Sequence, residues 1–361
     1  MMEEFKKKWT EIKRKRRIEI HINSLSIGEM KRMSMEKFLQ RENSQISRIF
    51  SVKNSLVDVI YICPFTLTNE IIGYYSKVLE IGEIENPNSR FNIVVPENYI
   101  KFPAHLPTSS ILLYSPKALK RIKWLIKSKQ AYIVPGIPST DDIKLSMELG
   151  VPLLSGEPQK AQLYSTKSGC RRILNLADVP IPIGAYDIYD ENEFEITLTK
   201  LILNHLHINT WVFKIDDEFS GRGHASYNIE HLKFVKDLRN KKAEVTEPLI
   251  QKLQDRVRKD LPRKVKIAMP TLYRNWNAFI ADFCTIGGVI EAAPNCPPSS
   301  IFSPSVAFLI GKCLQCWVLI FCVEPDGNVE VIGSFDKFHG REFVNAGCFF
   351  PQTSLPNMVI F

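Results

Sequence analysis

The sequence predicts a mixed α/β protein whose first large domain is Rossmann-like, meaning a mostly parallel sheet with helices on its faces. Residues 18–155 alternate short apolar runs with segments of helical periodicity, and this alternation favours parallel strands joined by helical crossovers. The chain is also long enough for a sizeable core, because it has 361 residues, of which 45% are hydrophobic and 24% charged. A chain of this length predicts two or three lobes.

The first predicted element is a basic helix over residues 1–17. Phe5, Trp9 and Ile12 are spaced four and three residues apart, which places them on one helical face. The segment holds eight Lys and Arg against three Glu, so it carries +5 of the chain's net charge of +8. Two interpretations stay open: a solvated helix that leads in from an upstream region, or a basic amphipathic helix that binds calmodulin.

The next predicted domain covers residues 18–155. Its strand-like runs are RIEIHI, VDVIYICPF, RFNIVVPE, SSILLYS, AYIVPG and VPLLSG, and its helix-like runs are TNEIIGYYSKVLEIG, PKALKRIKWLIKSKQ and STDDIKLSMELG. The polar stretch at about 24–55 is weakly periodic, so we expect a loop or excursion there rather than core. No GxGxxG motif follows a strand, so a dinucleotide site is not predicted.

The remaining residues, 156–361, form the last predicted domain. A helix over 158–178 is expected to break near Ser168 and Gly169, and a strand in IPIGAYDIYD and a helix over 191–206 follow it. Residues 211–216 read as a strand, and residues 230–262 are charged and helical in pattern. Further strands are predicted in KVKIAMP, GGVIEAAP, SPSVAFLI and DGNVEVIGSF.

The strand WVFKI and the turn after it predict a binding site for an anion. Side chains alternate along a strand, so Lys214 lies on the face opposite Trp211 and Phe213. The turn consists of Ser220, Gly221, Arg222 and Gly223. Glycines let backbone N–H groups approach a phosphate, and a nearby lysine adds a point charge. The alternative is an ordinary hairpin with a glycine turn and an exposed lysine.

Taken together, two stretches resemble the ATP-grasp superfamily: VPGIPSTDDIKLSMELGVPLLSGEPQKAQLYSTKSGCRRILNLADVPIPIGAYDIY and WVFKIDDEFSGRGHASYNI. The phrases AYIVPG, LYSTKSG and PDGNVEVIGSFDKF resemble most closely the branch that contains peptide ligases of antibiotic biosynthesis and the animal IQ-motif-containing protein H. The resemblance spans about residues 130–350. It implies a Rossmann-like pre-ATP-grasp domain over 18–155 and an ATP-grasp domain over 156–361.

The resemblance also implies the residues of a nucleotide site. Lys167 and Lys214 match the two lysines that hold the phosphates of ATP, and the turn at residues 220–223 matches the lid loop. Glu291 matches the hinge acid that the family places near the adenine and ribose. Two alternatives stay open, namely that Lys167 is an exposed helix lysine and that Glu291 is a surface acid at the end of a strand.

The implied chemistry is activation of a carboxylate as an acyl phosphate, which needs Mg²⁺ on the phosphates. Beyond Gly333 the acids are Asp336 and Glu342, and neither resembles the family's closing acid-x-Asn. We therefore expect an ATP-grasp domain that is incomplete at its metal-binding end, with Mg²⁺ bound only in a longer form.

The favoured function is a nucleotide-binding scaffold or regulatory protein related to calmodulin-binding IQ-motif proteins, with a role in male germ cells that the resemblance implies. The alternative is an ATP-dependent carboxylate–amine ligase. The sequence assigns no catalytic base.

The segment GKCLQCWVLIFCV, residues 311–323, interrupts an otherwise continuous hairpin pattern. We interpret it as a retained short intron, and the alternative is that Cys313 and Cys316 form half of a zinc or redox site. Lys312 and Gln315 interrupt the apolar run around it, so no membrane helix and no membrane partner are expected.

Composition also bounds the compartment and the partners. The eight cysteines show no regular spacing and no apolar leader follows Met1, so a reducing cytoplasm is expected. Much of the positive charge lies in residues 1–17, so nucleic acid is not expected to be the primary partner.

Overall fold

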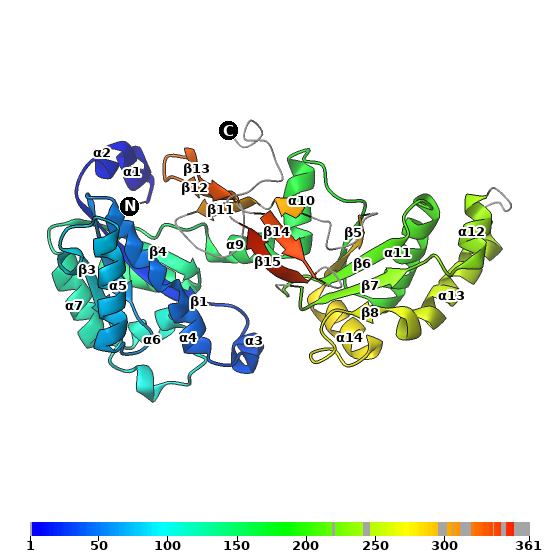
Figure 1. Ribbon diagram of the computed structural model, residues 1–361, viewed down its shortest axis with the longest axis horizontal. Coiled ribbons are helices and arrows are strands. Elements are labelled where there is room, and N and C mark those ends of the chain that lie inside the picture. The colour runs from blue at the N-terminus through cyan, green and yellow to red at the C-terminus, as the bar shows by residue number, and fades with distance from the viewer. Residues whose placement is uncertain are drawn as a thin grey trace. The chain divides into compact units, whose positions relative to one another are not determined.

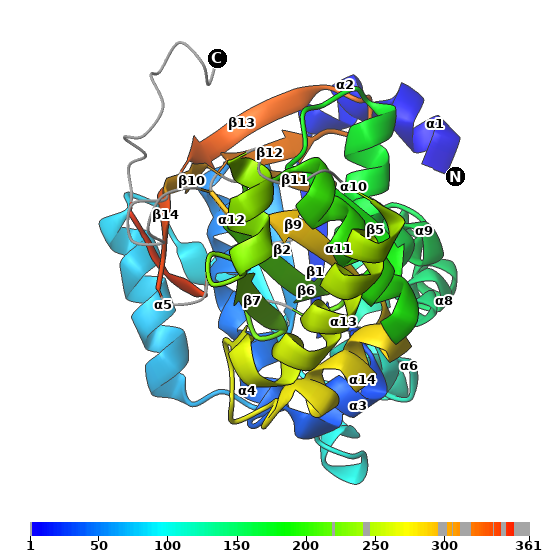
Figure 2. The same ribbon diagram turned by 90° about the vertical axis from the view of Figure 1, so that its right-hand side faces the viewer.

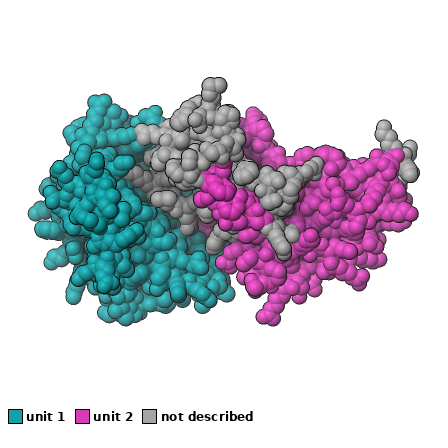
Figure 3. Space-filling view, viewed as in Figure 1, with its two compact units in different colours: residues 1–161, 306–333 teal, residues 162–305, 334–361 magenta. Residues whose placement is uncertain are grey.

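The structure is a computed structural model that describes residues 2–218, 221–240, 246–294, 302–304, 306–310, 319–334, 336–340 and 344–349. The chain divides into two compact units (Figure 3). Unit 1 contains residues 1–161 and 306–333, and unit 2 contains residues 162–305 and 334–361. Within the described ranges, none of the helices combines the length and the hydropathy needed to cross a bilayer.

Unit 1 is built on a four-stranded parallel sheet (Figure 1). Its strands are β1 (Arg17–Leu25), β2 (Val57–Ile62), β3 (Phe91–Val94) and β4 (Gln130–Ile137). The order is β3-β2-β1-β4, so the predicted Rossmann-like layer is confirmed. Ile20, Ile22 and Ile62 are fully buried, as expected for strands with both faces covered.

The predicted helices of this unit are α5 (Asn69–Ile81), α7 (Pro116–Ile126) and α8 (Thr140–Leu149). The prediction of a strand in SSILLYS is wrong, because residues Thr108–Leu113 form helix α6. Short apolar runs do not distinguish buried helix from strand. VPLLSG contributes one isolated bridge, between Ile133 and Leu153. The 3₁₀ turns η2 (Pro87–Ser89) and η3 (Tyr99–Lys101) precede and follow β3.

The prediction that residues 24–55 lie outside the core is also wrong. This stretch forms α3 (Glu29–Ser34), α4 (Phe38–Asn43) and the 3₁₀ helix η1 (Ser44–Lys53). Ile46, Ile49 and Val52 are buried against β2. Their spacing of three residues matches the three residues per turn of a 3₁₀ helix, a period that a search for α-helices does not detect.

The N-terminal basic segment forms α1 (Met2–Lys7) and α2 (Trp9–Lys13). The predicted common face is confirmed, and the interpretation of a solvated helix is wrong for that face. Phe5, Trp9 and Ile12 are buried in a cluster with Tyr132 and Val134 of β4. The ring centroids of Phe5 and Trp9 lie 5.6 and 5.7 Å from that of Tyr132.

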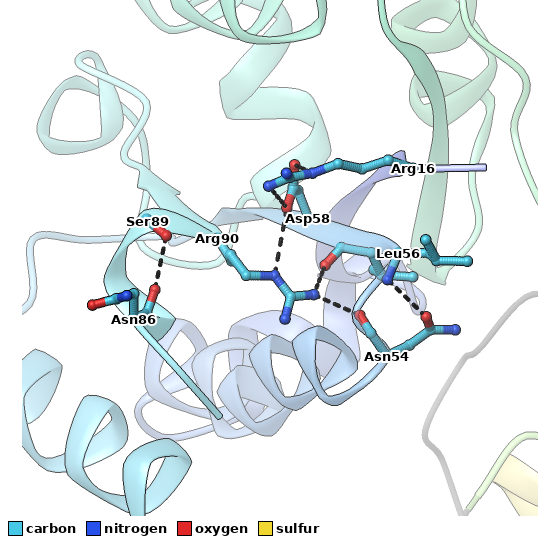
Figure 4. A network of polar contacts seen from close by, with 8 residues as sticks. Arg16, Asn54, Leu56, Asp58, Asn86, Ser89 and Arg90 are labelled. Carbon is cyan, nitrogen blue, oxygen red and sulfur yellow. Dashed lines mark hydrogen bonds and ion pairs between the residues drawn. The ribbon is translucent and has the colours of Figure 1, made fainter. Parts of the chain in front are cut away.

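A polar network ties together the beginnings of three strands (Figure 4). Arg16 Nε and Nη2 donate to the two carboxylate oxygens of Asp58 at 3.0 and 2.9 Å. Arg90 Nη2 donates to the carbonyl oxygens of Asn54 and Val57 at 2.5 and 2.7 Å. These contacts fix the amino-terminal edge of the sheet, whereas ligands of such sheets bind at the carboxyl edge.

Unit 1 also contains β11 (Val306–Ile310), β12 (Leu319–Val323) and β13 (Val329–Ser334), in the order β11-β12-β13. Residues 324–327 form the turn that joins β12 to β13, where Gly327 N donates to the carbonyl oxygen of Glu324 at 2.9 Å. Residues 311–318 lie outside the described residues, and so do Cys313 and Cys316. The interpretations of a retained intron and of a zinc or redox site both remain predictions.

Unit 2 is built on a five-stranded antiparallel sheet in the order β5-β9-β6-β7-β8. The strands are β5 (Gly184–Ile188), β6 (Thr210–Ile215), β7 (His224–Asn228), β8 (Lys266–Ile267) and β9 (Gly288–Ala292). Three helices, α11 (Glu191–Asn204), α13 (Glu247–Lys264) and α14 (Trp276–Ile286), bury their apolar residues on one face (Figure 2).

Helices α9 (Pro158–Ser165) and α10 (Lys167–Leu176) correspond to the predicted broken helix. The break lies at Thr166, two to three residues before the predicted position, because Thr166 Oγ1 accepts a hydrogen bond from Gly169 N at 3.0 Å and caps α10. Unit 2 also contains α12 (Lys233–Arg239) and a small antiparallel sheet of β10 (Phe302–Pro304), β14 (Asp336–His339) and β15 (Asn345–Phe349).

Candidate functional site

The candidate site lies on the face of the unit 2 sheet opposite α11, α13 and α14. Trp211, Phe213 and Ile215 point into the helical side and are fully buried. Lys214 points to the other face, and 26% of its side chain is exposed. The predicted alternation along β6 is therefore confirmed. It places the cation of Lys214 on the face of the sheet that does not pack against α11, α13 and α14.

Lys214 belongs to a three-membered ion-pair cluster. Its Nζ donates to Glu291 Oε2, and Arg171 Nη1 donates to Glu291 Oε1 at 2.8 Å. The side chain of Arg171 is 6% exposed and that of Glu291 is 13% exposed, so Glu291 is not the surface acid of the alternative interpretation. Burial raises the pKa of Glu291, but Lys214 and Arg171 outweigh it and the pKa is lowered. The carboxylate is therefore ionised.

Arg171 was not among the predicted site residues, and it lies one turn after Lys167 in α10. Its Nη2 donates to the carbonyl oxygen of Pro182 at 2.6 Å, and its guanidinium lies 5.8 Å from the ring centroid of Tyr186. Its Nε is buried and has no hydrogen-bond partner within the described ranges. The spacing of four residues from Lys167 is the signal that could have identified it, because such residues share a helical face.

Lys167 is the first residue of α10 and contacts the end of β6. Its ammonium donates to the carbonyl oxygens of Ile215 at 2.6 Å, of Asp216 at 3.3 Å, and of Glu218. The alternative of an exposed helix lysine is therefore wrong. A lysine has three N–H donors, so these carbonyls use all of them. To hold a phosphate, Lys167 would have to release at least one of these carbonyls.

Ser168 and Asp216 join the start of α10 to the same strand. Ser168 N and Oγ both donate to Asp216 Oδ1 at 2.9 Å, and Asp187 N donates to Ser168 Oγ at 3.0 Å. Burial raises the pKa of Asp216, and the hydrogen bonds from Ser168 oppose that rise. The network fixes the position of Lys167 relative to Lys214, and sequence reasoning missed it because its members are 48 residues apart.

His224 shows that the two lysines act on one region of unit 2. It lies directly opposite Lys214 in the β6–β7 pair. Burial first, and then the charges of Lys214 and Lys167, lower the pKa of His224 to about 3. Its buried Nδ1 has no hydrogen-bond partner among the described residues. Both ammonium groups therefore lie within electrostatic range of one neutral imidazole.

The predicted lid loop is partly described. Ser220 lies outside the described residues. Gly221 has a φ of +80°, and a Cβ at this position would lie 2.8 Å from the Cα of Val344, so the backbone conformation and the close packing both require glycine. A Cβ on Gly223 would lie 2.6 Å from that of Glu218, whose carboxylate is 3.4 Å from Arg222 Nε. The lid residues thus pack against the end of β6 and residue 344.

The donor set at this site fits an anion. Lys214 and Arg171 both pair with the carboxylate of Glu291, Lys167 lies at the end of the same strand as Lys214, and the buried Nε of Arg171 has no partner among the described residues. Among the described residues no group of three or more His, Cys, Asp and Glu is placed to bind a metal. Asp336 begins β14 and is buried, and Glu342 is not among the described residues.

Residues 158–360, more than half of the chain, match the family described as IQCH-like, ATP-grasp. The curated IQ motif-containing protein H of Danio rerio is 33% identical over 96% of this chain, and the chain spans about one third, 33%, of that relative.

Two solved structures resemble the chain distantly. N5-carboxyaminoimidazole synthetase from Staphylococcus aureus, complexed with ADP, has a TM-score of 0.41 and 12% identity, over 95% of this chain and 60% of its own. D-alanyl-alanine synthetase A from Vibrio cholerae has a TM-score of 0.37 and 11% identity, over 91% of this chain and 68% of its own.

Proposed function

Because the chain belongs to the IQCH-like ATP-grasp family, we propose that unit 2 binds ATP and serves as a nucleotide-binding scaffold or regulatory module. The observation that supports this most is that Arg171 and Lys214 meet at the carboxylate of Glu291, while Lys167 is held at the end of β6, the strand that carries Lys214. Such a cluster supplies both charge and hydrogen-bond donors to a polyphosphate.

We assign the residues to parts of the nucleotide as follows. Lys214 and Arg171 hold phosphate oxygens, and the unused Nε of Arg171 donates to one of them. Lys167 fixes the 215–218 segment and adds positive charge, and it reaches a phosphate if it releases a backbone carbonyl. Glu291 lies near the ribose or adenine, and residues 220–223 cover the phosphates.

When bound, ATP with Mg²⁺ would supply a phosphoryl group that can activate a carboxylate, which is the basis of the ligase alternative. The acids of the site are already engaged: Glu291 pairs with two cations and Asp216 accepts from Ser168. With no residue assigned as a general base, we favour the scaffold over the ligase and derive no catalytic step.

The test is an ATP titration with and without Mg²⁺, followed by thermal unfolding. Wild-type protein is expected to be stabilised by ATP, as any ligand that binds the folded state stabilises it. Lys214→Ala should lose most of this shift, since Glu291 keeps Arg171 as a partner while the phosphate loses its cation. The matched control Lys200→Ala changes an exposed lysine in α11 and should shift like wild type.

Equal ATP-induced shifts for wild type and Lys214→Ala would overturn the nucleotide proposal. Release of ADP that requires Mg²⁺ would favour the ligase over the scaffold. The two questions are separate, because binding is measured in the first experiment and turnover in the second.

We also propose calmodulin as a partner of the basic region at residues 1–17, in a cytoplasmic protein of male germ cells. The support is the basic amphipathic pattern and the relationship to IQ motif-containing protein H. The structure sets a condition on it: Phe5, Trp9 and Ile12 are buried, so calmodulin would have to displace α1 and α2 from β4 to reach the apolar face.

A further inference from the structure

Helix α7 and the residues after it carry a cationic surface that the nucleotide proposal does not use. Residues 116–130, PKALKRIKWLIKSKQ, contain six cations and no acid. All six side chains are exposed, and so is Trp124 between them, 73% of which is exposed. The basic surface of α7 is defined here as Lys117, Lys120, Arg121, Lys123, Trp124, Lys127 and Lys129.

The rotation of α7 is fixed by its buried side. Leu119, Ile122 and Ile126 belong to the core of unit 1. Successive residues of an α-helix are about 100° apart, so Trp124 lies at the middle of the opposite, exposed arc. Lys120 and Lys117 lie on either side of it, one and two turns towards the amino terminus. An indole therefore projects from the centre of a cationic ridge.

Few ion pairs compensate this charge within the described residues. Lys123 Nζ lies 2.6 Å from Glu148 Oε1, and both side chains are about half exposed, so the pair is weak. In the described parts of the chain, no other ion pair involves the basic surface of α7. Each of the other cations raises the local potential and attracts an anionic partner.

Large apolar side chains flank the ridge. Tyr114, 62% exposed, lies two residues before α7 begins. Met147, 73% exposed, lies in α8 next to Glu148, the residue that pairs with Lys123. The surface therefore combines lysines with exposed aromatic and thioether groups.

We propose that the basic surface of α7 binds the anionic headgroups of a lipid bilayer, as a peripheral contact of unit 1. Indole rings prefer the interface between headgroups and acyl chains, and lysines near the surface are attracted to anionic lipids. A convex ridge with an apolar crest also suits a flat surface. This proposal departs from the prediction of no membrane partner, which rested on the interrupted apolar stretch near residue 312.

Two features favour lipid over nucleic acid. Five of the six cations are lysines, which act as point charges, whereas arginine supplies the fork that recognises phosphate and bases bidentately. Single-stranded nucleic acid is bound by several stacked rings along a groove, and residues 116–130 offer one ring, Trp124, on a helix.

The experiment is cosedimentation of the full chain with phosphatidylcholine vesicles, with and without phosphatidylserine. Binding is expected with phosphatidylserine only, and to weaken as salt is raised. Lys120→Gln with Arg121→Gln should reduce the partition coefficient about 25-fold, since each charge near the surface contributes about fivefold. The control Lys200→Gln with Lys252→Gln removes the same charge from exposed positions in α11 and α13 and should bind like wild type.

The fluorescence of the indole gives a second measurement. Trp9, Trp211 and Trp276 are buried, and Trp317 lies outside the described residues. Insertion of Trp124 should produce a blue shift with phosphatidylserine vesicles that Trp124→Phe lacks. Equal vesicle binding by the Lys120/Arg121 variant and the control would overturn the proposal. An absence of binding to phosphatidylserine vesicles would also overturn the proposal. If the protein then bound a single-stranded RNA oligonucleotide, the surface would be assigned to nucleic acid.

Discussion

Substitution of Glu291 by glutamine tests the ion-pair cluster most directly. The change removes the carboxylate charge and keeps the shape of the side chain. Lys214 and Arg171 would then remain close together without their shared partner. Removing one member of a buried pair costs about 3–5 kcal/mol. Because 26% of the lysine side chain is exposed, we expect the lower end, about 3 kcal/mol of unfolding free energy.

The assay is urea denaturation of wild type and Glu291→Gln, with Glu191→Gln as a matched control. Glu191 is exposed in the first turn of α11, so its substitution should change the free energy of unfolding by less than about 0.5 kcal/mol. Equal stabilities for Glu291→Gln and the control would show that the cluster contributes nothing and would refute the reasoning.

Glu291→Gln also tests the contacts with the phosphates separately from the contact with the ribose or adenine. Without the carboxylate, inorganic tripolyphosphate should bind at least about tenfold more tightly, which adds about 1.4 kcal/mol to the stabilisation at saturating ligand. ATP should gain less, because the proposed contact of Glu291 with the ribose or adenine is weakened. If the affinities for both ligands rise equally, Glu291 contacts only the phosphates and not the ribose or adenine. If neither affinity rises, Lys214 and Arg171 do not bind an anion.

Three further predictions concern other parts of the fold. Burial raises the pKa of Glu42 to about 7 from 4.5, so the folded state binds a proton more tightly than the unfolded state. The contribution of Glu42 to the free energy of unfolding is therefore greatest below about pH 4.5 and is lost as pH rises through 7. Denaturation of Glu42→Gln at several pH values should lack this loss. Because Trp9 is buried, calorimetry should show calmodulin binding a peptide of residues 1–17 more tightly than the intact chain. Gly221→Ala should cost about 1–3 kcal/mol in denaturation, since its φ is +80°.

Each of these predictions has a contradicting result. An unchanged pH profile in Glu42→Gln would show that another group titrates. Equal calmodulin affinities for peptide and chain would mean that the burial of Trp9 does not limit access. Gly73→Ala is the control for Gly221→Ala, because a Cβ at Gly73 meets nothing within 4 Å and alanine favours a helix. A loss as large at Gly73 would contradict the argument from backbone conformation.

The sequence by itself determined the elements whose pattern is local and strong. The alternation in residues 18–155 predicted the parallel sheet, and the alternation in β6 predicted which face Lys214 occupies, because side-chain direction follows directly from the period of a strand. Phe5, Trp9 and Ile12 were likewise placed on one face by their spacing. These features need no knowledge of distant residues.

Only the tertiary structure decided what those faces contact. Burial of Trp9 against Tyr132, the pairing of Lys214 with Glu291, and the contact of Lys167 with the end of β6 join residues that are far apart in the chain. The helix in SSILLYS and the core role of Ile49 also depended on packing, since a short apolar run is compatible with either structure. Periodicity fixes the direction in which a side chain points, and the fold fixes what lies there.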